Sequence, residues 1–108
     1  MKSFRLTPQA EARLTEIALW TIDRFGVDQA RRYERDLIDR LHTLASGDPP
    51  HGKSCSTLVS GGHPVANLYY YRQGQHYIIY RDSPALLIVI DFLHGSRNLP
   101  RILEDLAK

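Results

Sequence analysis

The stretch L-L-I-V-I-D-F-L at residues 86–93 decides the fold of this chain, because it predicts a strand with no polar face. Alternation places one set of side chains on one face, Leu86, Ile88, Ile90 and Phe92. It places a second set on the other face, Leu87, Val89 and Leu93, interrupted only by Asp91. A strand that is apolar on both faces is typical of a sheet covered on both sides. We therefore expect helices on one face and a second cover on the other.

Two strands are predicted before this one. Residues 65–72 (V-A-N-L-Y-Y-Y-R) and 75–81 (Q-H-Y-I-I-Y-R) are rich in β-branched and aromatic residues. Gln73-Gly74 between them predicts a tight hairpin turn, and Asp82-Ser83-Pro84 predicts the next turn. Residues 2–6 (K-S-F-R-L) alternate and predict a short first strand, whereas Gly47 to Pro64 has the composition of a loop.

Two helices are predicted between the first strand and this loop. Thr7 and Pro8 form a helix start, and the first helix should run to Phe25 and stop at Gly26. Its apolar stripe is Leu14, Ile17, Ala18, Thr21 and Phe25. Asp28 should cap a second helix over 29–46, and so short a link predicts an antiparallel helical hairpin.

The resulting order is β-α-α-β-β-β, followed by a short C-terminal helix or tail over Leu99–Leu106. Helices grouped before a run of hairpin-connected strands indicate an α+β fold, with the helical hairpin on one face of a mainly antiparallel sheet. The 108 residues should form a single domain, 1–108.

Composition excludes several classes of protein. The net charge of +2 is too small to indicate nucleic-acid binding by itself, and the one cysteine, Cys55, allows no intrachain disulfide. No signal peptide and no membrane span are predicted, so a cytoplasmic location is expected. No nucleotide-binding or metal-ligand motif is present, so we expect no cofactor and no metal.

The sequence has more apolar side chains than a single core between the helices and the sheet would bury. Leu19, Trp20 and Ile22 lie outside the stripe of the first helix, and one face of the last strand carries Leu87, Val89 and Leu93. Large exposed apolar patches on proteins mark partner surfaces. The alternative is that the loop 53–64 folds over the sheet.

A metal-free ribonuclease is a second interpretation. Such an enzyme needs a general base, a general acid and cations that stabilise the phosphate. Arg72, Arg81, His94 and Arg97 are the candidates for these roles. The structural alternative is that they are ordinary strand-end residues.

The segment D-F-L-H-G-S-R-N-L at 91–99 places a histidine at the end of the last strand. His94 continues the alternation of Phe92, so its side chain should point to the helix-covered face. A buried ring there needs a partner, either a backbone carbonyl of residues 47–52 or the Tyr33 hydroxyl. Arg97 should leave the turn on the rim, where it can meet an acidic side chain of a partner.

Five segments in order resemble one known family over residues 4–100. They are L-T-P-Q-A-E-A-R-L-T-E-I (6–17), F-G-x-x-Q-A-x-x-Y (25–33), L-x-x-L-A-x-x-D-P-x-x-G-K (41–53), H-Y-I-I-Y-R (76–81) and V-I-D-F-L-H-G-S-R-N-L (89–99). The chain resembles the ParE-like toxins of the RelE/ParE superfamily of type II toxin–antitoxin systems, which include plasmid stabilization proteins. The resemblance implies a helical hairpin packed on a curved antiparallel sheet.

The same resemblance implies partners and an activity. The implied partner is a ParD-like antitoxin that forms a hetero-oligomer with the toxin, and operator DNA would be bound only through that antitoxin. Antitoxin contacts are expected at Leu19, Trp20, Ile22, Leu87, Val89, Leu93 and Arg97.

ParE members are described as DNA gyrase inhibitors, and RelE members cleave mRNA on the ribosome. The sequence has no tyrosine after Tyr80 and only Arg72 and Arg81 on the middle strands, which favours the non-enzymatic ParE branch. A RelE-like endoribonuclease and a non-toxic homologue that only binds its antitoxin are the alternatives.

Overall fold

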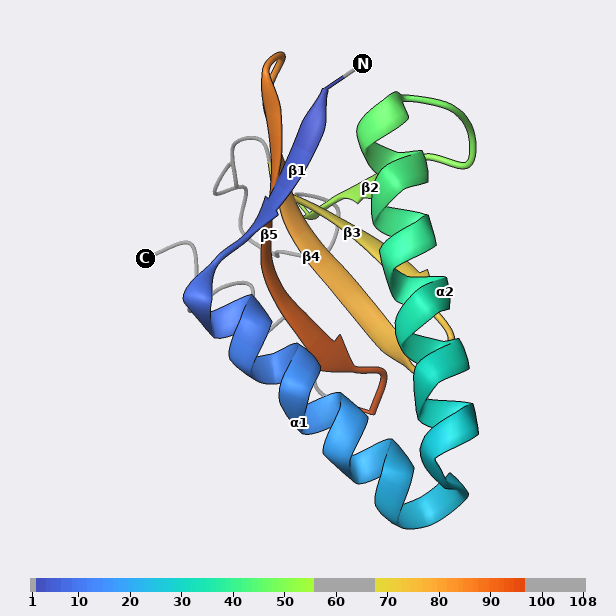
Figure 1. Cartoon of the computed structure of the whole chain (residues 1–108). Helices are drawn as coiled ribbons and strands as arrows, with labels where there is room; N and C mark the ends of the chain where they lie inside the picture. Colours follow the sequence, from blue (N-terminus) through green and yellow to red (C-terminus); the bar gives the residue numbers. More distant parts are fainter. Residues whose placement is uncertain (1, 56–67, 97–108) are drawn as a thin grey trace.

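A computed structural model describes residues 2–55 and 68–96. Two helices lie against one mixed five-stranded sheet of order β1-β5-β4-β3-β2 (Figure 1). The strands are β1 (Ser3–Leu6), β2 (Lys53–Ser54), β3 (Leu68–Gln73), β4 (His76–Asp82) and β5 (Leu86–His94). β1 pairs with β5 in parallel and the other pairs are antiparallel. The predicted α+β class is confirmed, and β2 is a strand that the sequence did not predict.

Helices α1 (Pro8–Phe25) and α2 (Val27–Ser46) are joined by one residue, Gly26. The Thr7 hydroxyl accepts a hydrogen bond from the Ala10 amide at 3.1 Å, so the predicted N-cap of α1 is confirmed. Gly26 ends α1 with φ of 92°, a backbone conformation that favours glycine. The prediction that Asp28 caps α2 is wrong, because α2 begins at Val27 and Asp28 lies in its first turn. A carboxylate there still stabilises the positive end of the helix dipole.

The main core lies between the two helices and the sheet. α2 contributes Leu37 and Leu41, which are fully buried. The other buried members are Ala10, Ile17, Leu44, Ala45, Ile78, Tyr80, Leu87, Val89 and Phe92. Burial of these side chains supplies most of the stability expected of a domain this small.

A β-bulge changes which residues of β5 face the helices. Ile79 pairs with Asp91 but Tyr80 pairs with Val89, so Ile90 is an extra residue in β5. Phe92 faces the helices as predicted. Before the bulge the parity is reversed, so Leu87 and Val89 enter the main core and Ile90 packs on the opposite face. The prediction of unbroken alternation along 86–93 is therefore wrong for the first half of the strand.

The opposite face of the sheet holds a second apolar cluster. Cys55, Leu68, Ile79 and Leu93 are its buried members, and Tyr70, Tyr77 and Ile90 pack against them. β5 therefore packs against apolar side chains on both faces, as its sequence predicted. Burial raises the pKa of the Cys55 thiol to about 12, so this cysteine stays protonated and unreactive at neutral pH.

The first turns of α1 are fastened to β5 by polar contacts. The Asp91 carboxylate, which is buried, accepts hydrogen bonds from Gln9 Nε2 at 2.8 Å and from Arg13 Nε at 3.2 Å. The Thr7 hydroxyl donates to the carbonyl of Ile90 at 2.9 Å. All these bonds reach the bulge, so the irregularity in β5 is also where α1 attaches.

Three predicted features lie outside the described residues: the loop over 56–64, the C-terminal helix over Leu99–Leu106, and Arg97. Neither α1 nor α2 is long and apolar enough to cross a membrane.

Candidate functional site

The end of α1 and the start of α2 carry the largest exposed apolar side chains of the described chain. They are Leu19, Trp20, Ile22, Phe25 and Val27, each at least 40% exposed. Figure 1 shows that both helices continue past the end of the sheet before they meet at Gly26, so the last turn of α1 has no strand beneath it. The exposure expected for Leu19, Trp20 and Ile22 is confirmed. Phe25 was predicted in the core stripe and is 64% exposed instead.

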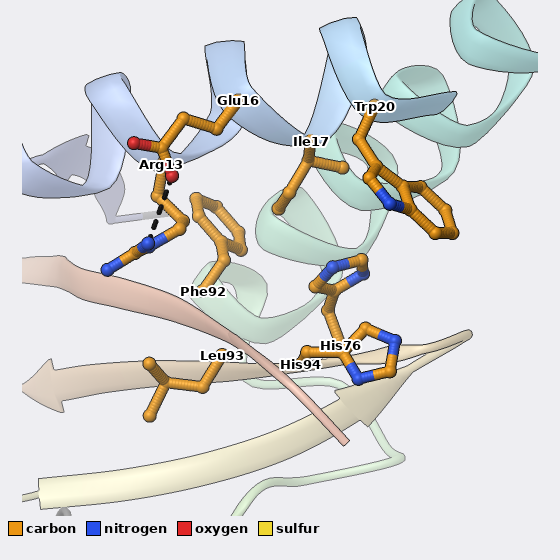
Figure 2. Close-up of a pocket in the computed structure, with 8 residues that line it drawn as sticks. All are labelled: Arg13, Glu16, Ile17, Trp20, His76, Phe92, Leu93 and His94. Carbon is orange, nitrogen blue, oxygen red and sulfur yellow. Dashed lines mark hydrogen bonds and ion pairs between the residues drawn. The ribbon is translucent and has the colours of Figure 1, made fainter. Parts of the chain in front are cut away.

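Two clefts lie beside this apolar surface and share Trp20 and His76. The first, of about 270 Å³, is drawn in Figure 2, where Arg13, Ile17 and Trp20 of α1 lie above Phe92 and His94 of β5 and His76 of β4. The second, of about 300 Å³, continues toward Phe25, Gln29 and Tyr33. We call the two clefts together the helix–sheet groove. Its walls are mainly apolar, and Trp20 and His76 mark its middle.

His76 forms the floor of this groove and is held by Tyr33. The Tyr33 hydroxyl lies 2.6 Å from His76 Nδ1 and accepts a hydrogen bond from the Gln75 amide at 3.0 Å. Burial, followed by the charge of His94, lowers the pKa of His76 to about 4, and burial raises the pKa of Tyr33. Both groups are therefore neutral at pH 7, and the groove floor carries no charge there.

The hairpin turn beneath Tyr33 depends on Gly74. This residue has φ of 60°, and a Cβ built on it would lie 2.6 Å from the Tyr33 ring. A glycine is therefore required both by the turn and by the close approach of Tyr33. The turn itself comprises Gly74 and Gln75, one residue later than predicted, because Gln73 pairs with His76.

His94 lies on the helix side of the sheet, as its parity predicted, and its ring meets His76 edge to face at 5.3 Å. It is nevertheless exposed, and its Nδ1 lies 2.8 Å from Ser96 Oγ. The predicted bond to Tyr33 is made by His76 instead. His76 was not among the predicted site residues, although its parity with Ile78 and Tyr80 in β4 indicates that it points inward.

The structure brings together only some of the ribonuclease candidates. Arg81 pairs with Ile88, six residues along β5 from His94, which corresponds to about 20 Å. Arg81 also lies on the face of the sheet away from the helices, whereas His94 lies on the helix face. The Arg72 guanidinium, in contrast, reaches the turn after His94, because a Cβ built on Gly95 would lie 3.0 Å from it. Arg97 lies outside the described residues. Among the described residues the structure therefore brings Arg72 close to the end of β5 that carries His94, and keeps Arg81 apart from it.

The fold places the predicted antitoxin-contact residues in different environments. Leu87 and Val89 are fully buried under the helices, so the prediction that they form a partner surface is wrong, and the bulge is the reason. Leu93 is buried in the second cluster but also lines the first cleft. Leu19 lines a separate hollow with Glu11 and Glu34 on the outer side of the helices. Trp20 alone of the predicted residues lies in the middle of the groove.

No set of three His, Cys, Asp or Glu side chains within residues 2–55 and 68–96 is arranged to hold a metal ion.

The sequence of this chain is similar to those of known proteins. Residues 4–99 match the family model described as the ParE toxin of the type II toxin–antitoxin system parDE. Toxin ParE1 of Mycobacterium tuberculosis (strain ATCC 25618 / H37Rv) is 34% identical over 104 residues, covering 93% of this chain and 96% of that protein. Toxin ParE1 of Caulobacter vibrioides is 33% identical over 98 residues, covering 91% and 94%.

A solved structure agrees at the level of the fold. A chain of the chromosomal ParDE TA system from P. aeruginosa superposes with a TM-score of 0.67 at 14% identity, covering 87% of this chain and 96% of that one. The family match extends over both helices and all five strands described. This chain therefore belongs to the ParE toxin family of type II toxin–antitoxin systems.

Proposed function

We propose that this toxin is neutralised by a ParD-like antitoxin that occupies the helix–sheet groove. The observation that carries the proposal is the exposure of Trp20, Ile22 and Phe25 beside two apolar clefts. A patch of this kind on one face of a small protein is typical of a partner surface. The relatives and the solved ParDE structure support an antitoxin as that partner.

The chemistry of the groove defines the antitoxin segment that would fit it. Apolar side chains spaced along an amphipathic helix can enter both clefts at once, with Trp20 between them. Trp20 is an aromatic side chain with its face held by the Arg24 guanidinium at 4.8 Å and its edge against Phe25. A large aromatic residue held in this way at the centre of an interface is the usual position of a binding hot spot.

An affinity measurement with the antitoxin encoded beside this toxin tests this proposal. Trp20→Ala should weaken binding by at least about 2 kcal/mol, roughly thirtyfold, because it removes the central contact. Leu19→Ala is the matched control, since Leu19 is exposed on the same helix but lines a different hollow. Equal loss of affinity for both variants, or no loss for Trp20→Ala, would contradict the proposal that the antitoxin binds in the groove.

We further propose that the target of the toxin is DNA gyrase, and hence that it acts in the cytoplasm by binding. Membership of the ParE family supports this, as does the separation of Arg81 from His94, two of the four ribonuclease candidates. Operator DNA would be bound through the antitoxin, which is the usual DNA-binding member of such a pair.

Induction of the toxin alone, with two readouts, tests the target. We expect loss of negative supercoiling and an SOS response first, and loss of supercoiling when purified toxin is added to gyrase. Cleavage of mRNA within minutes, with gyrase unaffected, would identify an endoribonuclease. Growth and supercoiling that both remain normal would identify a homologue that only binds its antitoxin.

A further inference from the structure

The described strands carry all their positive charges on the face away from the helices. Phe4 and Leu6 pack on the main core, so alternation turns Arg5 to the other face. In the same way Lys53 pairs with Tyr70, Arg72 pairs with Tyr77, and Arg81 follows Ile79, all on that face. The four cations, Arg5, Lys53, Arg72 and Arg81, are all exposed.

The two acidic residues of the described strands have partners beside β1 or on α1. Asp82 has the helix-facing parity of Ile78 and Tyr80 and is paired with Lys2. Asp91 lies at the bulge and is bonded to Gln9 and Arg13 of α1. Within β1–β5, the exposed charged side chains on the face away from the helices are therefore all cations, which surround the second apolar cluster, although the net charge of the whole chain is only +2.

Two tyrosines stand among these cations. Tyr70 and Tyr77 are half-buried, and their rings meet edge to face at 5.9 Å. The Arg72 guanidinium lies 5.4 Å from the centre of the Tyr77 ring. Together with His51, Lys53 and Tyr71 they line a hollow of about 320 Å³, which we call the tyrosine–lysine hollow. No acidic side chain lines it.

Flat aromatic faces beside lysine and arginine select one class of ligand. A tyrosine ring stacks on a planar base, and the adjacent cations hold a phosphate. A ligand that repeats a base and a phosphate along its length uses both features, whereas an acidic peptide uses only the cations. In a duplex the bases are stacked on each other, so a duplex offers the hollow only its phosphates.

We propose that the tyrosine–lysine hollow binds single-stranded nucleic acid, with a base against Tyr70 and Tyr77 and flanking phosphates on Lys53 and Arg72. The hollow lies on the face of the sheet opposite the helix–sheet groove, so antitoxin binding and strand binding are separate properties. The proposal goes beyond the proposed function and does not depend on gyrase being the target.

Fluorescence anisotropy with the purified full chain tests this site. The probes are oligothymidylate and oligouridylate of about 12 nucleotides, and a duplex of the same length. We expect both single strands to bind more tightly than the duplex, with an affinity that falls as salt rises. The preference between the two single strands then assigns the natural ligand to DNA or RNA.

Variants separate the contributions to binding. Lys53→Gln should lower the salt dependence by about 0.7 in log–log slope, as one lost phosphate contact does for a single strand. Tyr77→Leu should weaken binding between about fivefold and a hundredfold, because a stacking face is lost. Arg35→Gln, an exposed change on α2, is the matched control and should leave both values unchanged.

Thermal melting of Tyr77→Leu checks that this half-buried position still folds, and Lys53 is exposed, so its variant tests the site without touching the core. Duplex binding as tight as single-strand binding would overturn the proposal. So would an affinity that Lys53→Gln and Tyr77→Leu change no more than Arg35→Gln does.

Discussion

The two halves of α1 have opposite relations to the rest of the molecule. The first half is fastened to β5 through Thr7, Gln9 and Arg13, and it buries Ala10 and Ile17. The second half extends past the end of the sheet and exposes Leu19, Trp20, Ile22 and Phe25. One continuous helix thus includes a segment that stabilises the fold and a segment whose apolar residues contribute little to it.

This difference shows that the position of an apolar residue in a helical stripe does not by itself determine whether the residue is buried. Ile17 and Phe25 share one stripe in the sequence, yet Ile17 is buried and Phe25 is 64% exposed. The two residues differ in exposure because the sheet lies beneath Ile17, whereas no strand lies beneath the last turn of α1, which contains Phe25. Each prediction below tests whether stability belongs to the fastened half and binding to the exposed half.

The largest expected effect comes from a matched pair of phenylalanines. Phe92→Ala removes a fully buried ring that packs under α1 and should lower the free energy of unfolding by about 3–5 kcal/mol. Phe25→Ala removes an exposed ring and should change it by less than about 0.5 kcal/mol. Urea unfolding of both variants measures the contrast. Similar losses would mean that the second half of α1 is as much part of the core as the first.

The pH dependence of stability should report on the floor of the groove between the two halves. His76 has a folded-state pKa of about 4 against an ordinary value of 6.5, so the unfolded chain binds its proton more readily. Stability is therefore complete above pH 6.5 and falls as the pH drops toward 4, by up to about 3 kcal/mol from this group.

Urea midpoints measured from pH 4 to 7 should show this slope in the wild type and a flatter curve in His76→Gln. His51→Gln, an exposed change, should keep the wild-type slope. An unchanged slope in His76→Gln would assign the pH dependence to another group.

Loss of the Asp91 carboxylate should weaken the attachment of the first half of α1 to β5. Asp91→Ala leaves Arg13 and Gln9 without their buried acceptor and should lower the free energy of unfolding by about 2 kcal/mol. Glu16→Ala is the control, because Glu16 pairs with the same arginine at the surface and should cost less than about 0.5 kcal/mol.

The smallest effect is expected at the start of α1. Thr7→Ala removes the N-cap bond to Ala10 and should cost about 1 kcal/mol, whereas Thr7→Ser retains a hydroxyl and should cost less. Melting temperatures of the two variants measure the difference. If serine and alanine are equally destabilising, the methyl group of Thr7 and not its hydroxyl supports the helix.

Sequence patterns predicted the parts of the fold that depend on neighbouring residues. The cap at Thr7, the stop at Gly26, the two helices and the antiparallel strands after them follow from local spacing and turn chemistry. The family resemblance was carried by the same segments and is confirmed by the family match over residues 4–99.

What the sequence did not predict depends on contacts far along the chain. The bulge at Ile90 arises from pairing with β4, and it moved Leu87 and Val89 from a predicted partner surface into the core. The length of the sheet beneath α1 determined the exposure of Phe25. Both wrong predictions assume that a regular spacing of apolar residues continues along the whole strand or helix. In the structure the bulge interrupts that spacing in β5, and the sheet ends before the last turn of α1.

The parallel pairing of β1 with β5 has a consequence for how this protein is made. Ser3 lies opposite Leu86 and Leu6 lies opposite Val89, so β1 leaves the ribosome long before the strand with which it pairs. Contacts this distant in sequence form late, because the loop between them must close first. The bonds from Gln9 and Arg13 to Asp91 have the same delay. Until β5 has emerged from the ribosome, the nascent chain therefore has neither its complete sheet nor the residues that hold the start of α1, and its first cleft lacks Phe92 and His94.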